Sequence, residues 1–128
     1  MSEIRFVTLR QVKAIHQQQI TMFGGSLGIL DEGKLESAVL RGQNLHNYNP
    51  QADLYDLAAV GWGITNNHPF VDGNKRTAFV VMAVFLQINE IILTASEVDV
   101  VNIMLAVATS EILQEQLGNW LRDSSIKK

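Results

Sequence analysis

The chain of 128 residues contains no cysteine, only two prolines and no long hydrophobic run. The absence of cysteine excludes a disulfide scaffold and a thiolate zinc site, and it suits a reducing cytoplasm. The longest continuous apolar run, Ala78 to Leu86, is too short to cross a bilayer as a helix. The first residues, MSEIRFVTLRQV, include no long apolar segment. We therefore expect no signal peptide, no membrane partner and a cytoplasmic protein.

Charged residues are also few, at 18% of the chain, and the formal net charge is −3. General nucleic-acid binders are usually basic, so we expect no direct nucleic-acid binding, although a local cationic pocket remains compatible with this balance. Hydrophobic residues make up 47%, which indicates a globular rather than a disordered chain. The length fits one domain, residues 1–128, which would bury about two thirds of its unfolded surface.

What the chain does contain is helical periodicity. Thr8, followed three residues later by Gln11, forms a capping-box pattern at the start of a first helix that ends at Gly24–Gly25. Asp31 is a good N-cap for a second helix. The stretch from Arg41 to Asp53 is polar and rich in turn-forming residues, so we expect an exposed loop there.

Four more helices follow from the hydrophobic pattern, and the short β-branched stretch EIILTA is expected to be extended or irregular. The approximate helical ranges are 53–66, 75–89, 96–109 and 111–122. The range 75–89 is apolar on every face, which is typical of a buried helix. We therefore predict an all-α fold, a compact bundle of about six helices around this central helix.

The segment HPFVDGNKRTAF, from His68 to Phe79, gathers polar residues at the mouth of the apolar central helix. If Asn74 is the N-cap, Lys75 and Arg76 lie in the first turn, where cations oppose the helix dipole at a cost of roughly 0.3–1 kcal/mol. That arrangement is reasonable if an anion binds there, because helix N-termini and nests of N–H groups bind phosphate. Gly73 has no Cβ and would let the anion approach the backbone.

Other residues of the segment add chemistry or rigidity. His68 is a candidate general base, because an imidazole serves most often in that role. Asp72 either pairs with Arg76 or helps to hold Mg²⁺, which typically takes one or two protein carboxylates. Pro69 ends the preceding helix, and Phe70 is expected to bury its ring and anchor the loop. Together these groups indicate phosphoryl or nucleotidyl transfer, although each alone also fits a helix cap, a turn or a solvated surface.

The same segment resembles the motif of the Fic/Doc superfamily, H-x-F-x-[D/E]-G-N-G-R-x-x-R. It departs from that motif where Lys75 replaces the second glycine and Phe79 replaces the final arginine. The death-on-curing (Doc) branch has a motif ending in N-K-R-T-A, which is also the sequence here, and the upstream stretch FGGSLGILDEGKLESAVLRGQ resembles that family too. The resemblance covers nearly the whole chain and implies the helical Fic/Doc fold. The matching positions are His68, Phe70, Asp72, Gly73, Asn74 and Arg76.

The resemblance implies a role for each of these positions. His68 would accept the proton of an attacking protein hydroxyl, and Asp72 would help to hold Mg²⁺. Gly73, Asn74 and the N–H groups that follow would form an anion cradle. The two cations after Asn74 would bind the phosphates of the nucleotide, and Phe70 would be structural.

The two departures from the motif indicate which reaction to expect. In Fic enzymes the cradle holds the α-phosphate and AMP is transferred, whereas the nucleotide of the Doc branch is understood to bind in reverse and to present its γ-phosphate. With Lys75 in the cradle and no arginine at Phe79, the resemblance implies a toxin of a type II toxin–antitoxin system. Its substrate would be ATP, and it would phosphorylate a Ser or Thr of a translation elongation factor and arrest growth. The alternatives are an AMP transferase, a non-catalytic binding module and a helical DNA-binding module.

Control by a partner chain is also expected. Many Fic proteins carry an inhibitory [S/T]-x-x-x-E-[G/N] helix, and this sequence has no match to that pattern. We therefore expect a cognate antitoxin to silence the site in trans. The stretch Gln43–Gln51 is a candidate flap that would guide the target polypeptide by strand addition. His46 in that stretch is expected to be exposed, and His16 to be structural or exposed.

Overall fold

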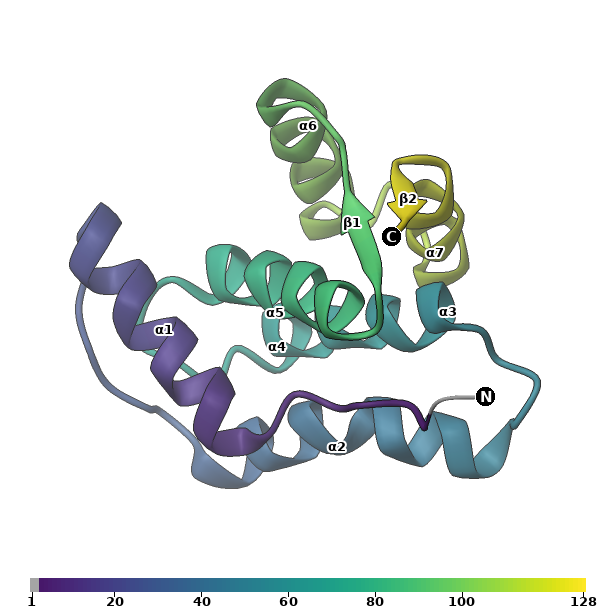
Figure 1. Ribbon diagram of the computed structural model, residues 1–128. Helices are drawn as coiled ribbons and strands as arrows, with labels where there is room; N and C mark the ends of the chain where they lie inside the picture. The colour runs from purple at the N-terminus through teal and green to yellow at the C-terminus, as the bar shows by residue number, and fades with distance from the viewer. Residues whose placement is uncertain (1–2) are drawn as a thin grey trace.

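The computed structural model describes residues 3–128, and most of them are helical (Figure 1). Helix α5 (Asn74–Ile88) runs through the middle of the molecule, so the predicted all-α fold with a central helix is confirmed. None of the helices formed by residues 3–128 has the length and apolar character needed to cross a membrane. The other helices are α1 (Leu9–Phe23), α2 (Glu32–Tyr48), α3 (Leu54–Ala59), α4 (Gly63–Asn67), α6 (Glu97–Ala108) and α7 (Gln114–Asp123).

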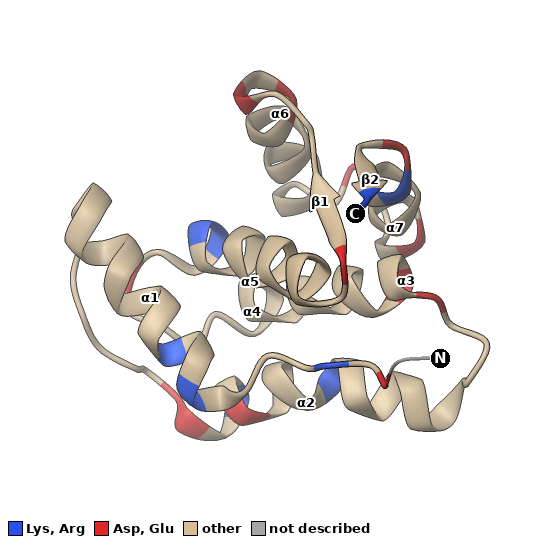
Figure 2. Cartoon of the chain, in the orientation of Figure 1, with Lys and Arg blue, Asp and Glu red and all other residues tan. Residues whose placement is uncertain are grey.

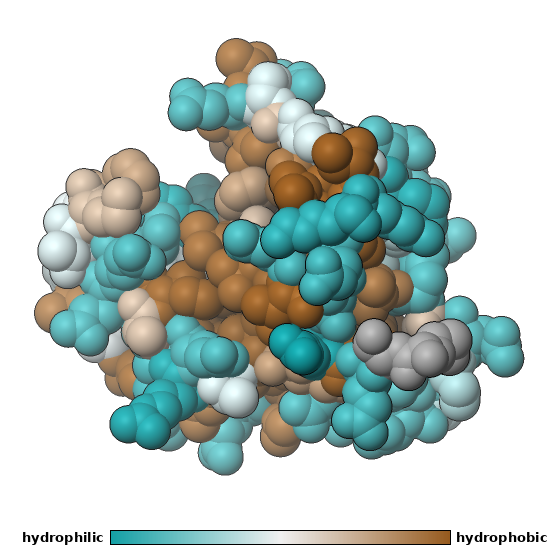
Figure 3. Space-filling view, viewed as in Figure 1, coloured by the Kyte–Doolittle hydropathy of each residue, from teal (hydrophilic) through white to brown (hydrophobic). Residues whose placement is uncertain are grey.

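Helix α5 is central because apolar residues cover most of its circumference. Its buried side includes Val81, Met82, Phe85 and Leu86. Fully burying one large apolar side chain contributes about 1.5–3 kcal/mol, so this side anchors the helix firmly. Residues on the remaining faces, such as Phe79, are half-buried, and Figure 3 shows apolar side chains gathered over α5 between α1 and α6. The helix is therefore a fixed support for the loop at its N-terminal end.

Helix α1 packs against α5, and its first residue follows from its cap. Thr8 accepts a hydrogen bond from the N–H of Gln11, and the Gln11 side chain accepts one from the N–H of Thr8, so the predicted capping box is confirmed. Val12 is buried, whereas Phe23 is 61% exposed. Phe23 lies in the last turn of α1, at the end that projects away from α5 in Figure 1, and the guanidinium of Arg76 lies over its ring, 5.7 Å from the centroid.

The prediction of an exposed loop from Arg41 to Asp53 is wrong, because α2 continues to Tyr48. Gly42 is buried and Leu45 packs against the core, so contacts with the core recur at helical spacing through a stretch rich in turn-forming residues. Tertiary packing outweighs the weak local preference of asparagine for turns here. The candidate flap Gln43–Gln51 is therefore mostly helix, and His46 is half-buried rather than exposed.

The third predicted helix is divided into α3, a 3₁₀ turn (Val60–Trp62) and α4. The turn brings the backbone of Gly61 against α5, where an added Cβ would lie 3.1 Å from Cγ of Met82. A regular helix with larger residues would not fit so close to α5. The break therefore sets the position of α4, and with it the start of the motif loop.

The C-terminal part contains a strand pair that the sequence predicted only in half. Strand β1 (Ile91–Leu93) is extended as expected, and it pairs antiparallel with β2 (Ser125–Lys127), which was not predicted. Helix α7 begins at Gln114 and not at Glu111 as predicted. The reason is that Ser110 adopts φ 61° and the N–H of Glu111 bonds back to α6, which closes that helix with a left-handed turn.

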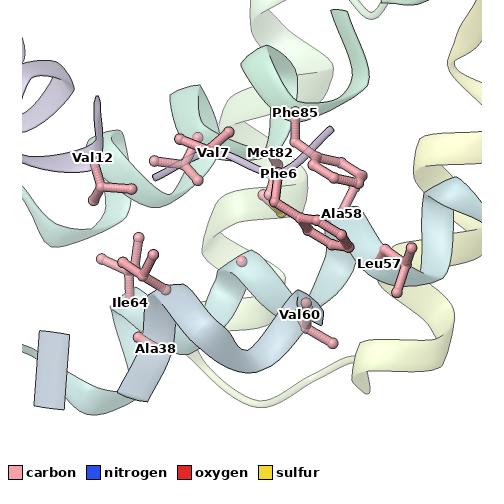
Figure 4. A pocket seen from close by; sticks show the side chains of 14 residues that line it. Phe6, Val7, Val12, Ala38, Leu57, Ala58, Val60, Ile64, Met82 and Phe85 are labelled. Atoms are coloured by element: carbon pink, nitrogen blue, oxygen red, sulfur yellow. The ribbon is translucent and has the colours of Figure 1, made fainter. Parts of the chain in front are cut away.

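A small cavity lies in the core between the N-terminal segment, α2, α3 and α5 (Figure 4). Its volume is about 40 Å³, and apolar side chains such as Phe6, Val12, Ile64 and Phe85 line it. This is room for a few water molecules at most, and apolar cavities stay dry. A nucleotide or a peptide would not fit, so a functional site has to lie at the surface.

Candidate active site

The motif loop between α4 and α5 lines an open cavity of about 630 Å³. The structure brings together there six of the predicted site residues, while the side chains of Pro69 and Phe70, in the same loop, are buried in the core. The burial of Phe70 is complete, at 0% exposure, which agrees with the expected anchoring role of its ring. The cavity is lined by Thr65, Asn66, His68, Val71, Asp72, Gly73, Asn74, Lys75, Arg76 and Ala108.

His68 caps the C-terminal end of α4 in a left-handed conformation, with φ 51° and ψ 51°. A residue with a Cβ adopts this conformation at a cost of roughly 1–2 kcal/mol. Hydrogen bonds at Pro69 offset this cost. The carbonyl of Pro69 accepts them from the N–H groups of Leu30 and Asp31, at 2.7 and 3.3 Å. The His68 side chain is exposed in the cavity, where a general base would have to be.

Asn74 is not the N-cap of α5, so this prediction is wrong. Gly73 caps the helix in a left-handed conformation with φ 76°, which glycine adopts readily. Asn74 is the first helical residue, and its amide is buried: Nδ2 donates to the carbonyl of Phe70 at 2.9 Å, and Oδ1 accepts from the N–H of Phe70 at 3.0 Å. The side chain of Asn74 therefore holds the loop in place. Only the N–H groups at the start of α5, which have no acceptor within the helix, can face an anion.

Asp72 does not pair with Arg76 in the part of the chain that the structure describes. Its Oδ1 accepts from the N–H of Gly73 at 2.9 Å, and its Oδ2 accepts from the N–H of Ser26 at 3.3 Å. Arg76 instead donates through Nη2 to the carbonyl of Gly24 at 3.0 Å. Lys75 and Arg76 are the only cations of α5, and Figure 2 shows them at its N-terminal end.

The donor set of the cavity fits a magnesium ion that travels with a nucleotide. Residues 3–128 contain no cluster of three ligating side chains, and Asp72 supplies the carboxylate at the cavity. Mg²⁺ commonly takes one or two protein carboxylates and completes its shell with water and phosphate oxygens. A site of that kind, with Asp72 as its protein ligand, matches what is present.

Comparison with protein-family models matches residues 6–86 to a model described as the Fic/DOC family. The chain belongs to this family. The match covers the motif loop as well as α1, α2 and the loop between them.

Two relatives place this member of the Fic/DOC family in its Doc branch. One, named "Protein kinase doc" from Escherichia phage P1, is 29% identical over 120 residues, which cover 93% of this chain and 94% of that protein. The other, named "Toxin Doc" from Mycolicibacterium smegmatis, is 41% identical over 75 residues, which cover 57% of this chain and 58% of that protein.

The glycine-rich loop that follows α1 packs against the motif loop of this family member, although none of its residues lines the cavity. The carbonyl of Gly28 accepts a hydrogen bond from the N–H of Val71 at 3.1 Å, so the loop runs beside the motif like a short strand. Gly25, with φ 115°, passes so close to the motif that an added Cβ would lie 2.6 Å from Oδ2 of Asp72. Close backbone approach therefore explains the glycine at this position.

Sequence reasoning missed the supporting residues of this Fic/DOC site. It did not assign Ser26 a contact with the motif, and it left His16 as structural or exposed. His16 is buried, with Nε2 2.8 Å from the carbonyl oxygen of Asp72. A usable signal was present, because His16 lies four residues from both Val12 and Ile20 and so shares the apolar face of the first helix.

Proposed function

We propose that the protein is a toxin of the Doc type that transfers the γ-phosphate of ATP to a Ser or Thr hydroxyl of a translation elongation factor. The observation that carries this proposal is Lys75, which stands in the first turn of α5 with its side chain exposed in the cavity. A lysine there puts a long charged side chain where a glycine would let phosphate reach the backbone. The name of the phage P1 relative, a protein kinase, agrees with phosphate transfer.

The proposed reaction begins with a hydroxyl of the target next to His68. The imidazole takes the hydroxyl proton while the oxygen forms a bond to the γ-phosphorus, and the bond from that phosphorus to the bridging oxygen of ADP breaks. Lys75, Arg76 and the free N–H groups at the start of α5 offset the negative charge that spreads over the phosphate oxygens. Asp72 would hold Mg²⁺, which neutralises phosphate charge when bound.

The target polypeptide is proposed to approach along the loop between α1 and α2, and not along the stretch where a flap was first expected. That loop contacts the motif, and exposed apolar side chains lie on it and on the last turn of α1. Met22, Phe23, Leu27 and Leu30 are all more than half exposed, at 62%, 61%, 59% and 64%. Exposed apolar groups gathered beside a catalytic loop are typical of a surface that binds a polypeptide.

Regulation by a cognate antitoxin is part of the same proposal. The relative from Mycolicibacterium smegmatis is named a toxin, which supports a partner chain that neutralises this one. The open cavity at the motif is the region that such a chain would have to close. Coexpression with the antitoxin should restore the growth of cells that express this protein.

Transfer of label from ATP tests the proposed chemistry. The purified protein is incubated with a translation elongation factor and with ATP labelled at the α- or at the γ-phosphate. We expect label from the γ-position only, together with a mass gain of one phosphate on the target. Label from the α-position only, with the mass gain of AMP, would establish the AMP transferase instead.

His68→Ala tests the base. The rate of transfer should fall by about 10²–10⁴-fold, which is the usual contribution of a positioned general base. His46→Ala is the matched control, because His46 is a half-buried histidine that does not line the cavity, and it should keep the rate of the wild type. If His68→Ala keeps full activity and full toxicity while folded, His68 is not the base.

A further inference from the structure

His16 is a buried histidine that belongs to no part of the motif. It lies on α1, is only 4% exposed, and its ring stacks on the ring of Phe70 with centroids 3.7 Å apart and planes 5° from parallel. Aromatic pairs generally prefer an offset or edge-on arrangement, so packing by itself gives little reason for a polar ring at this place. An apolar side chain would fill the same space without a polar nitrogen that needs a partner.

The reason lies in one hydrogen bond. Nε2 of His16 is 2.8 Å from the carbonyl oxygen of Asp72. A carbonyl oxygen can only accept, so Nε2 carries the hydrogen and donates it. The same peptide unit is held at its other end, because the N–H of Gly73 donates to Oδ1 of Asp72 at 2.9 Å. Both polar groups of the peptide between Asp72 and Gly73 are therefore satisfied in one orientation only.

The orientation of the peptide between Asp72 and Gly73 affects the geometry of the site. It joins Asp72 to the left-handed Gly73, which caps α5 and so directs the free N–H groups of its first turn. Helix α1 closes on this turn, since an added Cβ at Gly73 would lie 3.1 Å from Cδ1 of Ile20 and 3.8 Å from Cδ2 of His16. The side chain of Asn74 holds the loop through its hydrogen bonds to Phe70, and the described residues show no hydrogen bond from it to this carbonyl.

We infer that His16 is a positioning residue of the phosphate-transfer site. By donating to the Asp72 carbonyl, it fixes the peptide plane that sets the Asp72 carboxylate and the anion-binding N–H groups relative to His68. The inference rests on the proposed function for its catalytic consequence. Its structural consequence, a motif loop held by a histidine of α1, is independent of the reaction.

Three variants separate the hydrogen bond from packing. His16→Phe keeps a ring that can stack on Phe70 and lacks the donor, and His16→Gln keeps an N–H donor at similar reach. His46→Leu is the control for the loss of a partly buried histidine elsewhere. His16→Leu replaces His16→Phe if that variant does not fold.

The kinetic result should divide the variants by their donor. A misplacement of about 1 Å can cost on the order of 100-fold in rate, so kcat of His16→Phe should fall by about that factor. The KM for the protein target should change little, because the loop between α1 and α2 that contacts the motif is retained. His16→Gln should recover at least about tenfold of the loss, and His46→Leu should match the wild type.

Hydrogen–deuterium exchange gives a readout that does not depend on catalysis. Amides in the segment 70–77 should exchange faster in His16→Phe than in the wild type. In His16→Gln they should exchange more slowly than in His16→Phe, and in His46→Leu at the rate of the wild type. If the wild-type protein transfers no phosphate, the proposed function fails while the exchange result still tests the role of His16. Folded His16→Phe with normal exchange in this segment, or His16→Gln as impaired as His16→Phe, would overturn the inference.

Discussion

The double hydrogen bond of Asn74 makes a prediction about stability that can be worked out from the structure. Asn74→Ala removes the partner of both the N–H and the carbonyl of Phe70, which are bonded at 3.0 and 2.9 Å beneath the motif loop. Leaving a buried polar group without a partner costs about 1–3 kcal/mol, so two groups cost about 2–6 kcal/mol.

A loss of this size is large against the total stability of a small domain, which is typically about 5–15 kcal/mol. It should appear as a lower midpoint of urea unfolding, followed by circular dichroism, with an unchanged slope. Asn74→Asp should be at least as unstable, because it keeps an acceptor for the N–H of Phe70 and places a carboxylate oxygen against its carbonyl. Activity should fall with both variants, since the loop carries the site.

Asn66→Ala is the control for this prediction. Asn66 lines the same cavity, but it is exposed, and its side chain makes no hydrogen bond within residues 3–128. Its free energy of unfolding should stay within about 0.5 kcal/mol of the wild type. If Asn74→Ala is no less stable than Asn66→Ala, the reasoning about the buried amide is refuted.

Two further substitutions test other contacts. Gly25→Ala should lower the free energy of unfolding by about 1–3 kcal/mol and displace the carboxylate of Asp72. Gly24→Ala is the control, because no atom lies within 4 Å of the added Cβ and only the backbone cost remains. Equal losses of stability for the two variants in thermal unfolding would contradict the contact between Gly25 and Asp72. Burial raises the pKa of the Asp53 carboxyl, but a backbone N–H and the guanidinium of Arg122 lower it overall, below 3.8. The stability that the lowered pKa of Asp53 provides is present above about pH 3.8 and is lost as the pH falls further. Asp53→Asn should therefore be less stable than the wild type at neutral pH, by an amount that shrinks in acid. A difference in unfolding free energy that stays constant with pH would show that the carboxylate charge of Asp53 is not its cause.

Local capping and periodicity were enough to predict much of the fold. Thr8, Asp31 and Ser96 each bond through their side chains to an N–H three residues later, so these helix starts depend on neighbours in the sequence. The end of α2 could not be predicted in the same way. It depends on contacts of Gly42 and Leu45 with distant parts of the core, which outweigh local turn preference.

The candidate site was likewise predictable only in part. The motif predicted that His68, Asp72 and Lys75 would come together at the start of a helix, and the structure places all three at one cavity. Their chemical roles remain predictions. What each amide and ring of the loop bonds to was not predictable, and Asn74 was assigned to the wrong position for that reason.

The sequence by itself determined the helices, the buried central helix and a loop of charged residues at its mouth, because these follow from caps, periodicity and residue type at short range. Only the tertiary structure decided which polar groups face the cavity and which hold the loop. Packing of α1 against α5 places His16 against Asp72, 56 residues away in the chain, and buries the amide of Asn74 beneath Phe70. Buried polar groups must find partners, and only the packed structure sets which partners are within reach.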